Sequence, residues 1–358
     1  MRRIVTLFVA VFLLCCLLGG CGFWMAGEHL SVTPHEDQWG ITADTTVMVT
    51  SYAQLRNTLH DTVKSCAEKS IISISSFSNA TLDYYVSSAI NHVMKSTAVG
   101  AYAVDNITYE IGTKRGSSVV AFDITYRHSR ADILGMLQAG NSDETVKAIT
   151  NALEQHEARV VIHTENYESM DYTQLVQVYA NDHPNLVAEV PQVSFFVYPE
   201  RGSERIIELN FGYMTDREAL REMQTRVAEV FTSAELYVKD TTKVKDIYSR
   251  LYSFLMERNS DYTIETSITP AYSLLQHGVG DSKAFANVYA AMCRGAELDC
   301  TVVSGTRDAE PWCWNLVRYR GKYYHIDLLR CNENGQFTMH SPDEMIGYVW
   351  DYSAYPSS

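Results

Sequence analysis

The sequence predicts an α+β protein with two tandem α+β modules followed by a third domain of different organisation. Three observations predict this architecture. The chain has 358 residues, which is too long for one ordinary hydrophobic core. Apolar residues alternate between helical and strand spacing, and the same order occurs in residues 46–140 and again in 141–235. The pattern then changes, so that residues 236–358 form a separate domain.

The first 20 residues have the organisation of a signal peptide. A positive start with two arginines precedes an uninterrupted apolar run over residues 4–18, which is short for a membrane-spanning helix of about 20 residues. The run ends in a Leu-Gly-Gly-Cys sequence that resembles a bacterial lipobox. This resemblance implies cleavage before Cys21 and a lipid on its side chain, with residues 21–45 as a tether. The alternative is an uncleaved N-terminal anchor that merely contains a cysteine.

Both alternatives predict a membrane-anchored, extracytoplasmic protein of the bacterial cell envelope, with the membrane lipid as one partner through Cys21. The formal net charge of -14 argues against a nucleic-acid partner, which requires a basic face. The same charge argues against electrostatic adhesion to anionic lipid head groups.

Cysteine and histidine spacing predicts no metal site and no cofactor, because no cluster has the spacing of a zinc site. Five cysteines follow the anchor, so at least one is unpaired within a monomer. Cys293 and Cys300 could form one disulfide, but the sequence does not determine the pairing. The five are Cys66, Cys293, Cys300, Cys313 and Cys331.

Matched segments support the repeat within the two modules. Each copy predicts a helix, a β-branched strand, a second helix, a two-stranded hairpin and a closing helix. Ser129 and Asp216 are the N-cap candidates of the two closing helices. Identity between the copies is low, so unrelated modules with similar patterning are the alternative. Neither copy shows a catalytic constellation, and we interpret them as spacers or binding domains. The matched segments are 55–59 with 149–153, 71–74 with 160–163, 82–85 with 170–173, 101–111 with 190–200 and 119–126 with 206–213.

The third domain predicts helices over residues 247–255, 271–276 and 282–294, then strands over residues 300–305, 312–319 and 322–328. Four motifs occur in this order, and together they resemble the transglutaminase-like superfamily over residues 240–356. The resemblance implies the core of a papain-like cysteine protease. The motifs are Gly280-Asp281-Ser282 entering a helix, Val303-Ser304-Gly305, Trp312-Cys313-Trp314-Asn315, and Gly321-Lys322-Tyr323-Tyr324-His325-Ile326-Asp327.

That resemblance implies a catalytic Cys, His and Asp at the positions of Ser282, Trp312 and Asp327. Only the Asp is present. A hydroxyl depends more on an adjacent base than a thiol does, and an indole offers only a donor N–H. We therefore expect Ser282 to be the N-cap of its helix and the Trp312 ring to fill the space of the imidazole. Asp327 would accept a hydrogen bond from Trp312 or from a backbone N–H.

Two nearby residues are auxiliary candidates. His325 lies two residues before Asp327, but a displacement of about 7 Å along a strand fits a replacement base poorly. Asn315 is retained within its motif. Cys313 alternates with Trp312 and is expected to be a core thiol on the opposite face.

The leading functional hypothesis is a catalytically inactive transglutaminase-like domain that binds a peptide or protein, or serves as a scaffold, in the cell envelope. The replaced residues favour a function other than catalysis. The expected ligand is an extended peptide, a cell-wall component or an envelope protein. One alternative is a diverged hydrolase that cleaves amide bonds with Ser282 as nucleophile. Another is that the modules bind partners and the third domain only caps them.

Overall fold

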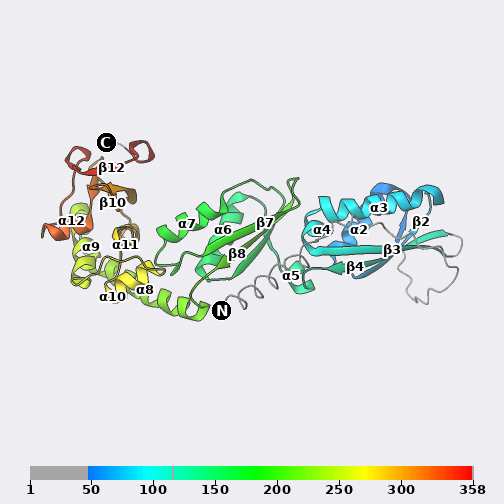
Figure 1. The fold of residues 1–358 in the computed structure, drawn as a ribbon, viewed down its shortest axis with the longest axis horizontal. Helices are drawn as coiled ribbons and strands as arrows, with labels where there is room; N and C mark the ends of the chain where they lie inside the picture. Colours follow the sequence, from blue (N-terminus) through cyan, green and yellow to red (C-terminus); the bar gives the residue numbers. More distant parts are fainter. Residues whose placement is uncertain (1–46, 115–116, 357–358) are drawn as a thin grey trace, which may run out of the picture.

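The computed structural model describes residues 47–114 and 117–356, and the predicted α+β class is confirmed. The predicted signal peptide and the whole of the predicted tether, with Cys21, lie outside these residues. Three units follow one another along the longest axis of the molecule, in the order of the sequence (Figure 1). Each unit has its own four-stranded sheet.

Module 1 is a sheet of strand order β1-β2-β4-β3 covered by helices. Its first two strands are parallel, and the other pairs are antiparallel. Leu55, Val86 and Phe122 are among the side chains that fill the core between helices and sheet. The elements are β1 (Val47–Val49), α2 (Tyr52–Lys64), β2 (Lys69–Ile74), α3 (Asn79–Ser96), α4 (Ala98–Ala103), β3 (Val104–Lys114), β4 (Ser117–Tyr126) and α5 (Arg130–Leu134).

Module 2 has the same topology, with strand order β5-β6-β8-β7 and one parallel pair between its first two strands. The predicted N-caps of both closing helices are present: the side chain of Ser129 accepts from Asp132 N and that of Asp216 from Ala219 N. The elements are β5 (Leu137–Ala139), α6 (Ser142–Glu154), β6 (Arg159–Thr164), α7 (Tyr172–Asp182), β7 (Gln192–Tyr198), β8 (Arg205–Gly212) and α8 (Arg217–Val238).

The likeness of the two modules extends to individual backbone bonds. Cys66 and His156 follow equivalent helices and have left-handed φ angles of 55° and 49°. Two residues later in each copy, a carbonyl accepts a bond of 2.8 Å from the central strand, Ile124 N to Glu68 O and Phe211 N to Ala158 O. The two modules therefore share one topology and equivalent backbone bonds at these irregular positions.

Two boundaries differ from those expected. The sheet of module 2 begins at Leu137 rather than after residue 140. The sequence did not predict this first strand, because β5 has only three residues and shows no periodicity of its own. Helix α8 runs through the expected boundary at residue 236. Its second half places Val227, Val230 and Phe231 in the core of the C-terminal domain, so one helix belongs to two units.

The C-terminal domain packs helices on one face of an antiparallel sheet of order β11-β10-β9-β12. Its central helix, α11, is buried almost throughout and contacts both β9 and β10. The elements are α9 (Val244–Arg258), α10 (Pro270–His277), α11 (Ser282–Gly295), β9 (Cys300–Arg307), β10 (Glu310–Tyr319), β11 (Lys322–Ile326), α12 (Leu328–Glu333) and β12 (Tyr348–Trp350), with 3-10 turns at Pro342–Glu344 and Tyr352–Ala354.

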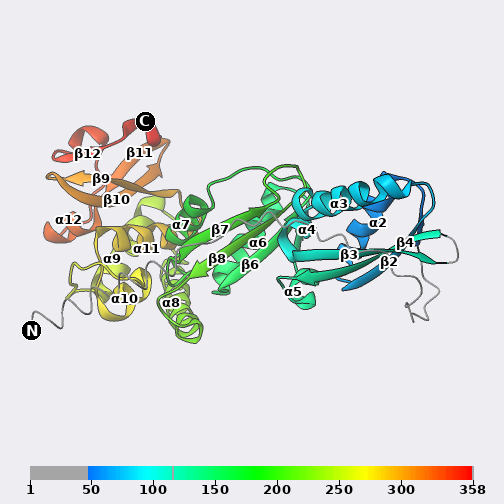
Figure 2. The same ribbon diagram turned by 45° about the vertical axis from the view of Figure 1, so that its right-hand side comes forward.

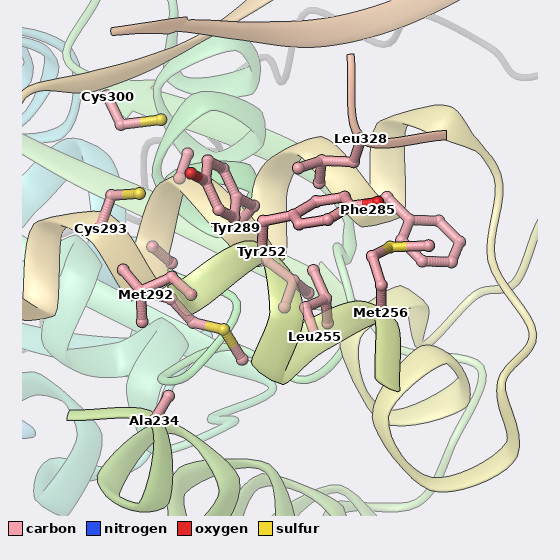
Figure 3. Packing of buried hydrophobic residues seen from close by; sticks show 14 of the residues in the cluster. Ala234, Tyr252, Leu255, Met256, Phe285, Tyr289, Met292, Cys293, Cys300 and Leu328 are labelled. Atoms are coloured by element: carbon pink, nitrogen blue, oxygen red, sulfur yellow. The ribbon is translucent and has the colours of Figure 1, made fainter. Parts of the chain in front are cut away.

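The core around α11 combines side chains from three helices and the sheet. Figure 3 shows Phe285 and Tyr289 of α11 beside Leu255 of α9. Cys293 and Cys300 lie beside one another at the end of this core with both sulfur atoms directed toward Tyr289, and all five described cysteines are free thiols. Burial first, and then a hydrogen bond to the Cys300 thiol, raises the pKa of Cys293 well above its usual value.

Gly305 of β9 lies where the sheet leaves no room for a side chain. A Cβ atom there would be 2.2 Å from Val349 O and 2.9 Å from the Trp314 ring. We expect Gly305→Ala to lower the free energy of unfolding by about 2–3 kcal/mol, the usual cost of overpacking a core. Urea unfolding monitored by tryptophan fluorescence measures this change.

The matched control is Gly212→Ala at the end of β8. There the nearest atoms to an added Cβ are those of Gln192, at 3.6 and 3.7 Å, which is ordinary contact. We expect this variant to differ from the parent by less than about 1 kcal/mol. Equal losses in the two variants would contradict the close approach at Gly305.

Candidate functional site

Ser282 is the first residue of α11, and Asp281 is its N-cap. The Asp281 carboxylate accepts from Ala284 N at 2.8 Å, so the expectation that Ser282 caps the helix is wrong. The physical reason is that Asp281 has the extended backbone an N-cap needs, while Ser282 already lies within the helix. Ser282 is 8% exposed, and its Oγ accepts from the backbone N–H of Cys313 in β10 at 3.1 Å.

Trp312 and Asp327 are joined directly. The indole Nε1 of Trp312, on β10, donates to Oδ2 of Asp327 at 2.9 Å. Both hydrogen bonds expected for this carboxylate are therefore present, since Asp327 is also the N-cap of α12 and accepts from the backbone N–H groups of Leu329 and Arg330. The Asp327 carboxylate lies where a carboxylate that orients a catalytic histidine would lie. Its partner here is the Trp312 indole, which can donate a hydrogen bond but cannot accept a proton.

Two further groups complete the surroundings of Asp327. The hydroxyl of Tyr348, on β12, donates to Oδ2 at 2.6 Å, and the guanidinium of Arg307, on β9, lies 3.5 Å from the same atom. Burial first, and then the charge of Asp327, raises the pKa of Tyr348. The carboxylate is 2% exposed, and it is compensated by four hydrogen bonds and one nearby cation.

Arg307 also covers the Trp312 ring. Its guanidinium carbon lies 5.2 Å from the ring centroid, within the range of a cation–π contact. Glu333 of α12 holds the other side of the guanidinium at 2.6 Å, and this bond is the main reason why the pKa of Arg307 is raised. Trp312 is thus held by a carboxylate at its N–H and by a cation over its face.

Neither Arg307 nor Tyr348 was identified by sequence reasoning. Arg307 lies two residues after the Val-Ser-Gly motif, and Tyr348 lies in the C-terminal tail, which resembles the ending of these domains but does not single out this residue. The order of motifs in the sequence predicts that β9 lies beside β10. It does not predict that the C-terminal tail returns as β12 next to β9, which brings Tyr348 to the site.

His325 does not meet Ser282. Its Nδ1 accepts from the Trp314 indole at 2.9 Å, and its ring lies 4.8 Å from that of Trp350. Burial, together with the neighbouring His340, lowers the pKa of His325 to about 4. The ring is neutral at pH 7, but its hydrogen bond ties it to the tryptophan cluster rather than to a nucleophile.

Asn315 connects the sheet to α11, since its Nδ2 donates to Ala286 O at 2.9 Å. Cys313 is half-buried, and its Sγ lies 3.6 Å from Ser304 Oγ. Burial raises the pKa of the Cys313 thiol, so this thiol is not activated. Both residues hold β10 in place against its neighbours.

The arrangement offers Ser282 no base. Over residues 47–114 and 117–356, no imidazole or carboxylate is hydrogen bonded to its Oγ, and the group that does reach this atom is a peptide N–H. Within the same residues, no three His, Cys, Asp or Glu side chains are grouped as a metal site would require. The geometry therefore supplies a packed polar junction in which the Ser282 hydroxyl accepts a backbone N–H.

A cleft of about 290 Å³ lies beside this junction, between module 2 and the C-terminal domain. Asp281 and Lys283 of the first turn of α11 line one wall, and Gln177 and Asn181 of α7 line the other. Figure 2 shows α7 next to α11 at the junction of the two units. The sequence could not indicate this cleft, because it arises only where the two units meet.

The low pKa of His325 predicts how stability depends on pH. Below about pH 6.5 the unfolded chain protonates this ring, whereas the folded chain does not until about pH 4, so the free energy of unfolding decreases as the pH is lowered from about 6.5 to about 4. The full contribution is at most roughly 3 kcal/mol. We expect His325→Gln, whose side-chain oxygen can still accept from Trp314, to give a shallower pH dependence in urea unfolding.

His277→Gln is the matched control, because His277 is exposed at the end of α10. We expect it to keep the slope of the parent between pH 6.5 and 4. If His325→Gln also kept that slope, the folded protein would not hold this imidazole neutral.

Comparison with known proteins finds one matching family and several similar solved structures. Residues 228–328 match the family described as the transglutaminase-like superfamily. One similar solved structure is described as a TGase, with 12% identity, a TM-score of 0.26 and coverage of 54% of this chain and 59% of that chain. No curated protein matches this chain.

Two further structures are similar at this level. The "Putative Cysteine Protease from Cytophaga hutchinsonii" has 10% identity and a TM-score of 0.26, with coverage of 44% of this chain and 70% of that chain. The "Putative Protease from Parabacteroides distasonis" has 10% identity and a TM-score of 0.23, with coverage of 72% and 40%. The family match to residues 228–328, over the helices and strands that hold Ser282, Trp312 and Asp327, shows that this chain contains a transglutaminase-like domain.

Proposed function

We propose that this protein is a lipid-anchored, extracytoplasmic component of a bacterial cell envelope, in which the transglutaminase-like domain is a non-catalytic binding or scaffold domain. One observation carries the proposal. The carboxylate of Asp327 holds an indole N–H, and the hydroxyl of Ser282 holds a peptide N–H. Both polar groups therefore accept hydrogen bonds from other residues of the same domain.

Proton transfer is the step that this arrangement lacks. A serine hydroxyl must lose its proton as it attacks an amide, so a base has to lie within hydrogen-bond reach. Trp312 stands at the position that the family resemblance assigns to the base, and it can only donate. Residues of a catalytic unit act together, so loss of the nucleophile and base typically removes most of the rate.

The retained Asp327 has a structural reason to persist. Its four hydrogen bonds join β10, α12 and β12. Removing the carboxylate would leave the Trp312 N–H and the Tyr348 hydroxyl without this acceptor in a buried setting, which typically costs about 1–3 kcal/mol for each group. A carboxylate at this position is therefore useful to the fold without any reaction.

The envelope location rests on the sequence of the first 21 residues. The positive start, the apolar run and the Leu-Gly-Gly-Cys sequence ending at Cys21 support export and lipid attachment. Among the residues that the structure describes, no helix is long and apolar enough to cross a membrane. The proposed anchor is thus the lipid on Cys21, with the three folded units beyond it.

A fluorophosphonate probe for activated serines tests the absence of catalysis. We expect no labelling of Ser282 in the folded protein, because its hydroxyl has no base, while a serine protease in the same assay is labelled fully. Peptide mass spectrometry identifies the labelled residue. Labelling or amide hydrolysis that Ser282→Ala abolishes would establish the diverged hydrolase instead.

Restoring the lost pair provides a second readout. We expect Ser282→Cys combined with Trp312→His to react with iodoacetamide at pH 7 at least about tenfold faster at position 282 than Ser282→Cys alone, because an adjacent imidazole favours the thiolate. Ser353→Cys with Trp312→His is the control, since Ser353 is exposed in the tail. No gain at position 282 would show that these two positions do not face each other.

A further inference from the structure

We propose that the cleft between module 2 and the transglutaminase-like domain binds an extended polypeptide segment of another protein, with an acidic side chain directed at Lys283. The inference rests on the proposed function, because a domain without catalysis would hold such a segment and release it unchanged. The cleft is separate from the junction at Trp312, which the fold itself fills.

Direct bonds between the two units hold the walls of the cleft. Arg294 of α11 donates to the carbonyl of Asp182 at the end of α7. Asn287 Nδ2 donates to Asn181 Oδ1 at 3.4 Å, a long bond at the floor of the cleft. The bond of Arg294 involves no residue of the cleft lining, whereas the bond between Asn287 and Asn181 joins two lining residues.

Side-chain amides dominate the polar lining. Gln177, Asn181, Gln192 and Asn287 come from three different elements and converge on the same space. Each amide offers both a donor and an acceptor, which is the complement of a peptide group. The side-chain amides of Gln177 and Gln192 have no hydrogen-bond partner within the described parts of the chain, so both amides are free for a ligand.

The charges of the cleft leave one cation free. Glu189 is 3% exposed, and its two oxygens already accept from Met214 N at 2.6 Å and Thr215 N at 3.1 Å. Asp281 is occupied as the cap of α11. Lys283 is exposed and forms no ion pair with any residue in the described ranges. Two carboxylates and one ammonium line the cleft, and both carboxylates already accept backbone N–H groups, so Lys283 is the lining charge that a carboxylate of the ligand would pair with.

An apolar rim and a sheet edge favour an extended ligand. Val190, Met214 and Ile268 line the cleft and are 38%, 76% and 52% exposed. Gln192, also in the wall, is the first residue of β7, which is the outer strand of its sheet among the described strands. An outer strand offers backbone N–H and C=O groups to a segment that adds alongside it.

A display library of random twelve-residue peptides is the probe, selected on the full chain in detergent. We expect acidic sequences to be enriched. The blocking variant is Gly212→Phe, because Gly212 lines the cleft and its backbone accepts a Cβ with contacts no closer than 3.6 Å. Fluorescence anisotropy should show that a selected peptide binds this variant at least tenfold more weakly, and that Lys283→Gln weakens it about fivefold.

Gly140→Phe is the matched control. Gly140 is exposed, lies at the start of α6 outside the cleft lining, and its added Cβ would meet only Glu144 Oε2, at 3.5 Å. We expect its affinity to stay within twofold of the parent. If Gly212→Phe fails to fold, a photocrosslinking residue replacing Met214 should capture the selected peptide, and one replacing the exposed Leu236 of α8 should not.

Each other outcome overturns a defined part of the proposal. Selected peptides that bind Gly212→Phe as tightly as the parent would show that the protein binds peptides, but at a site other than this cleft. No enriched peptide, or retention on purified peptidoglycan that Gly212→Phe abolishes, would refute the ligand class. Cleavage of a selected peptide, dependent on Ser282, would refute the proposed function itself.

Discussion

The transglutaminase-like domain depends on a buried carboxylate, that of Asp327, which accepts four hydrogen bonds and lies beside a guanidinium. An ionised Asp in a protein interior is costly unless hydrogen bonds and an opposite charge replace its water. Asp327 receives an indole, a phenol, two backbone N–H groups and a guanidinium, which together come from β9, β10, β12 and α12. The sheet, the last helix and the C-terminal tail therefore meet at one side chain.

The same logic applies at Ser282. Its hydroxyl links the first turn of α11 to the backbone of β10, as Asn315 does one helical turn further along. In both places a polar side chain at a position of potential chemistry secures the helix to the sheet. Ser282 and Asn315 therefore contribute to the fold itself, because each satisfies a backbone group between helix and sheet.

Much of this structure could be predicted from local sequence patterns, and the remainder depends on long-range contacts. The strands that follow α11, the caps Ser129 and Asp216, and the bond between Trp312 and Asp327 could be predicted, since each depends on short motifs or on a known order of motifs. The three-residue strand β5 is too short to show a period.

The remaining features depend on tertiary contacts that sequence spacing does not encode. Tyr348 reaches Asp327 only because the tail returns as β12, and the cleft exists only because module 2 contacts α11. At the start of α11, two adjacent residues are both of types that can cap a helix, and Asp281 rather than the expected Ser282 is the N-cap.

Helix α8 has a mechanical consequence. It is capped within module 2 by Asp216, is tied there through Arg217 and Glu157, and ends in the core of the next domain. Its 22 residues form a rod of about 33 Å without a linker. Such a strut resists bending, so the two units cannot pivot freely about their junction. A tension applied at one end of the molecule would be transmitted to the transglutaminase-like domain as a change of position rather than absorbed by a hinge.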